Sequence, residues 1–356
     1  MLLRLAALGM VTVGTASARG GGEDTVLALL PSGPSGFALL RLDPANFTTL
    51  PLCDLTRLGS IDAVVPVPSS RRAVLVLAVG VDYTIGFIDL STCTFDSASA
   101  IHVDGSLSTG GMFWGAFWDE QQGQAYYIDR HYPHGGETLV LSRVDFAARA
   151  LQRVAPLSPD LRQILNVRAA SSDGSPAVAL LLFANDTSIG VSTLEFRRGA
   201  ETSRLPFTPS NLGGFDFNAF ELVYDDGVES GSTQQRLLTR LRPQHQLSYS
   251  FGEISLKTGN LTLLGTFPPG GGLTDDDNPG VFLLWDGGWT SLFDDGAEWV
   301  LFRIELASSS AGGGQYNVKK SPCPEQGVCK WLQSSPFVFR NLTLPEPRER
   351  VTPSTY

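Results

Sequence analysis

Six copies of one short pattern run through the sequence. In each copy an alternating strand ends in an apolar residue followed by a polar one, and a turn then leads into a second strand. The copies are LLRLDPANFTTLPL, IGFIDLSTCTFDSA, LSRVDFAARALQRV, VSTLEFRRGAETSRL, FGEISLKTGNLTLL and LFRIELASSSAGGGQYNV. They align on Asp43, Asp89, Asp145, Glu195, Ser255 and Glu305. Because successive positions lie 46 to 60 residues apart and span most of the chain, the repeat leaves no room for a second domain.

A further pair of strands precedes most copies, for example in GAFWDEQQGQAYYID and ILNVRAASSDGSPAVALLLF. Each unit therefore has four strands of about 5 to 8 residues. A sheet of this kind cannot bury both faces alone, but sheets arranged radially pack each face on a neighbour. The pattern predicts an all-β, six-bladed β-propeller of four-stranded antiparallel blades. Seven blades, or a two-sheet sandwich, are the alternatives.

The two ends of the chain supply incomplete units. TVLALL and GFALLRL at the start are typical of second and third strands, and PFVFRNLTL at the end is an apolar strand without a unit of its own. We expect this C-terminal strand to complete the first blade and close the ring. The 38 glycines and 22 prolines, spread along the chain, agree with frequent turns and leave few long helices.

On these repeats, the sequence resembles the six-bladed β-propeller superfamily, which includes NHL and YWTD-type modules and extracellular lactonases. The resemblance is architectural and covers about residues 22–345. There is no WD dipeptide in blade register, no YWTD motif and no complete Asp-box; in LFDDGAEW, Leu292 occupies the position where an Asp-box has Ser or Thr. The resemblance therefore implies a fold and transfers no functional residue.

The N-terminus has the features of a secretory signal peptide. Arg4 supplies a positive charge, an apolar stretch follows, and Ala16-Ser17-Ala18 forms a small-x-small cleavage site. A membrane anchor is the alternative, but this apolar stretch is about half of the roughly 20 residues that a bilayer requires. We expect residues 1–18 to be a signal peptide, residues 22–345 to form one propeller domain, and residues 346–356 to be a polar tail. No membrane anchor is predicted.

Four sequons agree with an extracellular glycoprotein. The acceptor residues are Asn46, Asn185, Asn260 and Asn341. The formal charge of −10 disfavours binding to nucleic acid or to anionic lipid through a basic surface.

The four cysteines are expected to form disulfides in an oxidising compartment. Cys323 and Cys329 lie in SPCPEQGVC, a loop that can close on itself, which leaves Cys53 to pair with Cys93. Three connectivities are formally open. The sequence has no C-x-x-C pair and no histidine at zinc-finger spacing, which disfavours a zinc site.

Propeller geometry places the second-to-third turns and the crossings between blades on one face, where ligands usually bind. All four histidines are expected there, together with Asp82 and Asp129; the histidines are His102, His131, His134 and His245. In DRHYPHGGE, His131 and His134 are candidate general bases. The structural alternative is a solvated loop whose Pro and Gly set a turn.

Acidic loops on the same face are candidate calcium ligands. They contribute Asp275, Asp276, Asp277, Asp294 and Asp295. Three consecutive acids do not have the alternating spacing of an EF-hand, so a solvated charge run is the structural alternative. The polar residues that end the repeated strands have a structural interpretation, because an acceptor there can bond the N–H groups of the next turn.

Two functions are consistent with these features. The first is a secreted, glycosylated binding module that contacts an extracellular protein or glycan through the loop-rich face, without a cofactor. The second is a calcium-assisted hydrolase, similar to lactonases or esterases, with His131 or His134 as base. The sequence lacks GxSxG, HExxH, a Walker A loop and GxGxxG after a strand, which favours the binding module.

Overall fold

A computed structural model of the chain describes its strands and shorter turns. The described residues are 26–31, 37–43, 48–67, 70–79, 82–103, 112–131, 138–168, 176–185, 188–207, 221–225, 236–242, 248–267, 282–285, 288–294, 298–306, 316–324, 326 and 329. The expected signal peptide, the expected closing strand at 336–344 and the polar tail lie outside them. None of the helices in the described ranges is long and apolar enough to cross a membrane.

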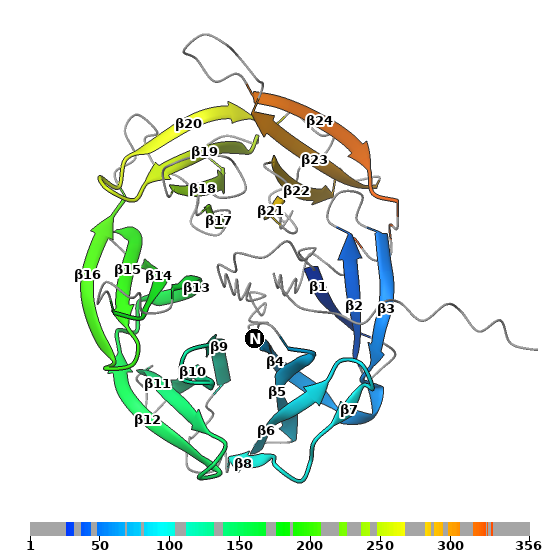
Figure 1. Cartoon of the computed structure of the whole chain (residues 1–356). Coiled ribbons are helices and arrows are strands. Elements are labelled where there is room, and N and C mark those ends of the chain that lie inside the picture. The colour runs from blue at the N-terminus through cyan, green and yellow to red at the C-terminus, as the bar shows by residue number, and fades with distance from the viewer. Residues whose placement is uncertain are drawn as a thin grey trace, which may run out of the picture.

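The described strands form six antiparallel sheets, which Figure 1 shows arranged in a ring. The first sheet consists of β1 (Val26–Pro31), β2 (Phe37–Asp43) and β3 (Thr48–Asp54). The second consists of β4 (Ser60–Val67), β5 (Arg72–Val79), β6 (Asp82–Asp89), β7 (Thr94–Phe95) and β8 (Ile101–Val103). The third consists of β9 (Met112–Asp119), β10 (Gln124–His131), β11 (Thr138–Asp145) and β12 (Ala150–Leu157). The first and second sheets are joined by a short 3-10 helix, η1 (Thr56–Leu58).

The other three sheets have the same order of four strands. The fourth consists of β13 (Leu161–Arg168), β14 (Val178–Ala184), β15 (Ile189–Glu195) and β16 (Ala200–Pro206). The fifth consists of β17 (Glu221–Asp225), β18 (Arg236–Leu241), β19 (Ser250–Ser255) and β20 (Leu261–Thr266). The sixth consists of β21 (Phe282–Trp285), β22 (Gly288–Asp294), β23 (Trp299–Leu306) and β24 (Tyr316–Pro322). The chain therefore has a propeller-like, all-β fold, as predicted.

The repeated pattern coincides with equivalent strands. Five of the six aligned residues are the last residues of β2, β6, β11, β15 and β19, and Glu305 is the next-to-last residue of β23. Where a sheet has all four strands, this is the third strand from the centre of the ring in Figure 1. The second sheet departs from the pattern, because β7 and β8 share the outer position beside β6.

The polar residue at the strand end organises the turn that follows, as expected. The Oδ1 atom of Asp89 accepts hydrogen bonds from the backbone N–H groups of Ser91 and Thr92, at 2.8 and 3.0 Å. The Oδ1 atom of Asp145 accepts one from Ala148 N–H at 2.8 Å. These bonds satisfy turn donors that have no strand partner, so the carboxylates serve the fold.

Four residues beyond the strand end, the turn has a positive φ in four sheets. The residues are Cys93, Arg149, Gly199 and Gly259, with φ between 51° and 73°. Each one meets the outer region of the preceding sheet. Cys93 is disulfide-bonded to Cys53 of β3, the Arg149 Nη2 atom donates to Ala98 O at 2.7 Å, and Gly199 and Gly259 pack closely on Ala155 and Pro206. One turn position thus joins consecutive sheets.

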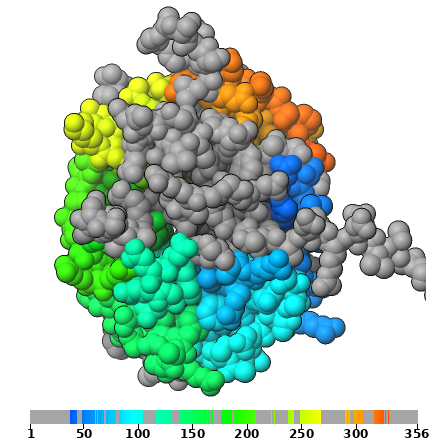
Figure 2. Space-filling view, in the orientation of Figure 1, coloured from blue at the N-terminus to red at the C-terminus, as the bar shows by residue number. Residues whose placement is uncertain are grey.

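Consecutive sheets also pack through apolar cores. Leu39 of β2 and Leu75 of β5 belong to the core between the first and second sheets. Between the third and fourth sheets, the rings of Phe117, Tyr126 and Phe196 lie 4.9 to 5.5 Å apart. Figure 2 shows the sheets in contact around the rim. Burial of these side chains between sheets supplies the main driving force for the fold.

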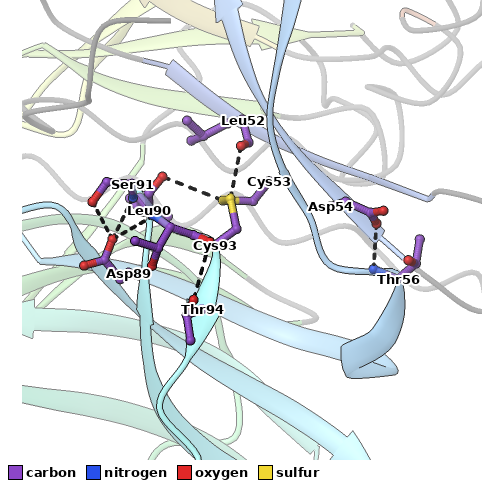
Figure 3. Close-up of a disulfide and its surroundings, with 10 residues drawn as sticks. Leu52, Cys53, Asp54, Thr56, Asp89, Leu90, Ser91, Cys93 and Thr94 are labelled. Atoms are coloured by element: carbon purple, nitrogen blue, oxygen red, sulfur yellow. Dashed lines mark hydrogen bonds between the residues drawn. A yellow bond between two sulfur atoms is a disulfide. The ribbon is translucent and has the colours of Figure 1, made fainter. Parts of the chain in front are cut away.

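Both disulfides join the predicted cysteines, Cys53 with Cys93 and Cys323 with Cys329. The first links β3 to the turn after β6 and so connects two sheets (Figure 3). The second closes a short loop after β24. The Gln326 side chain within this loop accepts a hydrogen bond from Trp299 N–H at 2.6 Å and donates one to Trp299 O at 3.0 Å. This loop is therefore fixed to the start of β23.

Candidate functional site

The strand directions define two faces of the ring. We call the face that carries the second-to-third turns and the crossings between sheets the crossing face, and the other the opposite face. The third-to-fourth turns of the opposite face are short where the structure describes them, at 90–93, 146–149, 196–199 and 256–260. The longest connections between strands are 207–220 and 267–281, which are crossings, and both adjoin the fifth sheet. The crossing face around the fifth sheet is therefore the sector richest in connecting chain.

The structure places the predicted site residues as follows. His131 is the last residue of β10 and Asp294 the last of β22, so both lead into second-to-third turns on the crossing face. Figure 1 shows these two strands on opposite sides of the ring, so the strands do not bring this pair together. The other candidates lie outside the described residues; they are His134, His245, Asp275, Asp276, Asp277 and Asp295.

Two candidate residues lie in strands and not in the loops where they were expected. His102 lies in the outer strand β8, exposed, with its Nδ1 atom 3.0 Å from Thr84 Oγ1. Asp129 lies within β10 and is only 7% exposed. The strand continues three residues further than the loop assignment assumed, because β10 pairs with β11 up to His131.

Asp129 is surrounded by a small polar group inside the molecule. It shares one face of β10 with Tyr127, and Ser142 of β11 donates a hydrogen bond from Oγ to Asp129 Oδ2 at 3.3 Å. Burial raises the pKa of Asp129 to about 7, although the Ser142 bond and the Arg153 charge favour its ionised form. Burial, together with the Asp129 charge, also raises the pKa of Tyr127 well above its usual value.

The fifth sheet contains a second buried charge near the same face. Arg240 of β18 is completely buried. Its guanidinium lies 5.1 Å from the centre of the Phe293 ring in the sixth sheet, and its Nη1 atom lies 3.5 Å from Leu292 O. Cation–π contact with a desolvated guanidinium stabilises such a position. Arg240 thus lies between the fifth and sixth sheets, one residue before the end of β18.

Sequence reasoning missed both buried charges. The available signal was a charged residue inside an otherwise apolar second strand, as in AYYIDRH and RLLTRL. Because natural cores almost never bury an uncompensated charge, such an interruption indicates a specific site.

Described side chains do not assemble into a metal centre: no group of three or more His, Cys, Asp or Glu residues within those ranges could hold an ion. Two of the four sequons have described acceptors. Asn185 is exposed in the turn between β14 and β15, where its Nδ2 atom donates to Asp160 Oδ2 at 3.2 Å. Asn260 is exposed beside β20. Asn46 and Asn341 lie outside the described residues.

Comparison with known proteins finds similarity in structure only. No protein-family model matches the chain, and no curated protein matches its sequence. TolB from Acinetobacter baumannii is similar with a TM-score of 0.49 and 14% identity over 86% of this chain, which spans 65% of TolB. The periplasmic gluconolactonase PpgL of Pseudomonas aeruginosa is similar with a TM-score of 0.48 and 14% identity, covering 83% of this chain and 82% of that one.

A chain of a nidogen–laminin complex is also similar, with a TM-score of 0.45 and 9% identity over 79% of this chain and 89% of its own. None of these similarities bears on activity.

Proposed function

We propose that the chain is a secreted, glycosylated, six-bladed propeller that binds an extracellular protein through its crossing face. The observation that carries this proposal is the unequal distribution of connecting chain. The two longest connections, 207–220 and 267–281, are both on the crossing face around the fifth sheet, whereas the longest connections of the opposite face, 169–177, 226–235 and 307–315, have 9 or 10 residues. Binding residues concentrate on connections that a rigid scaffold positions.

The chemistry of the longest connection favours a partner with a basic surface. It contains Asp275, Asp276 and Asp277, and the chain as a whole has a formal charge of −10. An acidic surface attracts a basic protein patch and repels a sulfated or sialylated glycan.

Two further features support the extracellular setting and the closed ring. Disulfides persist in oxidising compartments, and the described part of the chain has two. Among the described residues the first sheet has three strands where every other sheet has at least four. The apolar segment 336–344 is suited to the missing innermost position beside β1.

The test uses the protein secreted from a eukaryotic cell, screened against arrays of extracellular domains and of glycans. We expect binding to a basic protein domain that weakens as salt is raised, because salt screens exposed charges. A D275N/D276N/D277N variant should lose most of this binding. The matched control replaces exposed Arg198 on the opposite face with Ala and should bind normally. Retention by cells, binding only to glycans, or loss of binding in the R198A control would refute the proposal.

The alternative function is a calcium-assisted hydrolase. One observation is consistent with it, the location of His131 and Asp294 at second-strand ends on the same face, but β10 and β22 lie on opposite sides of the ring, so the two residues would belong to separate parts of that face. A thermal-shift series with calcium and with EDTA tests it, because a bound ion raises the unfolding temperature by mass action. Calcium-dependent stabilisation that D294N abolishes, together with lactone hydrolysis that H131A abolishes, would favour the hydrolase over the binding module.

A further inference from the structure

Asp129 lies with Tyr127 and Ser142 at an interface between two sheets whose core is mainly apolar. It shares a face of β10 with Tyr127, and Tyr127 packs in the core that joins the second and third sheets. From the second sheet, this core includes Val74 and Val76 of β5 and Ile85 of β6. A carboxyl group with 7% exposure in such surroundings loses most of its hydration, and this loss disfavours the charged form.

We propose that Asp129 is a pH-sensitive element of this interface: the neutral carboxyl stabilises the packing of the second sheet on the third, and its ionisation loosens it. Two residues separate Asp129 from the connection 132–137 on the crossing face. Ionisation of Asp129 is therefore expected to loosen the packing at the edge of the proposed binding face. The inference itself concerns stability and does not depend on what that face binds.

The described titratable or charged side chains that lie around Asp129 in this core are two tyrosines and an arginine, and His131 is a further titratable residue two positions along β10. Tyr127 on the same strand stays protonated, because burial and the carboxylate raise its pKa. Tyr83 is the tyrosine that β6 contributes to this core, and model tyrosines ionise near pH 10. Arg153 of β12 is paired opposite Ser142 and supplies the positive charge that favours the ionised form of Asp129. Asp82 and His102 are exposed and occupy strand positions that alternate with the core-facing Tyr83 and Ile101.

The direction of the pH effect follows from the two pKa values of Asp129, 3.8 for the unperturbed group and about 7 in the folded protein. Between them, the unfolded chain has lost the proton that the folded protein still holds. The contribution of Asp129 to the free energy of unfolding is therefore largest below about pH 4 and falls as the pH rises to about 7. Above that value both states are ionised, and this contribution is constant. The limiting slope is about tenfold in the folding constant per pH unit.

Denaturant unfolding of the full chain from pH 5 to pH 8.5 tests the proposal. For the wild type we expect the folding constant to fall roughly 10- to 100-fold between pH 5 and pH 7. In D129N the amide is neutral at every pH and keeps an oxygen for Ser142, so this fall should vanish and the variant should be the more stable protein at pH 8. The control D82N, which changes an exposed carboxyl on β6 of the second sheet, should keep the wild-type slope.

Two further measurements keep the proposal testable even if D129N does not fold. Infrared spectroscopy of the wild type should show the carbonyl band of a neutral carboxylic acid that disappears with a midpoint near pH 7. In S142A that midpoint should move to higher pH, because the Ser142 hydrogen bond favours the carboxylate. Parallel stability curves for wild type and D129N, or no titrating acid band above pH 5, would overturn the proposal.

Discussion

At the scale of single residues, an ion pair between sheets shows how charge is used inside this molecule. Arg197, in the turn after β15, makes two hydrogen bonds of 2.7 Å to the carboxylate of Asp119 at the end of β9. The Asp119 side chain has no exposed surface, whereas Arg197 is 24% exposed. The pair raises the pKa of Arg197, chiefly through the hydrogen bonds that Arg197 donates to Asp119. It joins the third sheet to the fourth.

Removal of Arg197 should therefore be costly. R197A leaves a buried carboxylate without its cation, and we expect a loss of about 3 kcal/mol in the free energy of unfolding. The neighbouring Arg198, whose side chain is 78% exposed beside Glu195, provides the control. R198A should cost less than about 1 kcal/mol. Urea unfolding of both variants checks this; equal losses would show that the inter-sheet pair has no special role.

Glycine at the positive-φ turn position gives a second residue-scale prediction. Gly199 has φ +66°, and a Cβ atom built there would lie 2.3 Å from the Ala155 Cβ atom. Gly123 has φ +61° with nothing within 4 Å of the same atom. We expect G123A to cost about 1 kcal/mol, from the backbone alone, and G199A about 2 kcal/mol or more. Denaturation midpoints measure the difference, which should disappear if the turn does not pack on β12.

At the scale of elements, the two disulfides constrain chain segments of very different length. Cys53–Cys93 closes 40 residues and connects two sheets, whereas Cys323–Cys329 closes 6. Loop-closure entropy predicts that C53A/C93A loses about 4 kcal/mol and C323A/C329A about 2 kcal/mol. Calorimetry of the two double variants gives the ranking. The reverse ranking would mean that the small loop matters through its Gln326 contacts with Trp299 instead.

The repeat explains why the elements could be predicted so well. Strand alternation, the polar strand end and the turn residues are local patterns, and a local pattern determines which segments pair as hairpins. The five aligned polar residues from Asp43 to Ser255 are therefore each the last residue of a strand. The split outer strand of the second sheet was not predicted. There, Asp96 accepts hydrogen bonds from Ala98 and Ser99 N–H in the turn that separates β7 from β8, both of which pair with β6.

At the scale of the whole molecule, closure of the ring decides how cooperatively it unfolds. If the segment 336–344 adds to β1, a chain ending at residue 335 should lose several kcal/mol and unfold in a broader transition, because the edge of the first sheet is left unpaired. A chain ending at 345 removes only the polar tail and should match the full chain. Circular dichroism melting distinguishes them, and identical melting of all three chains would exclude closure by this strand.

Sequence alone determined the class of fold and the strand ends, because these depend on the order of residues within a hairpin. It favoured the two disulfides, and the structure chose them among the three open connectivities. Candidate site residues were predicted less well. Asp129 was assigned to a loop, and neither the pairing of Asp119 with Arg197 nor the burial of Arg240 was foreseen. Only the tertiary structure decided these, because each depends on which face of one sheet meets which face of the next. Residues that share such an interface are brought together by the packing of one sheet on the next, not by their spacing in the chain.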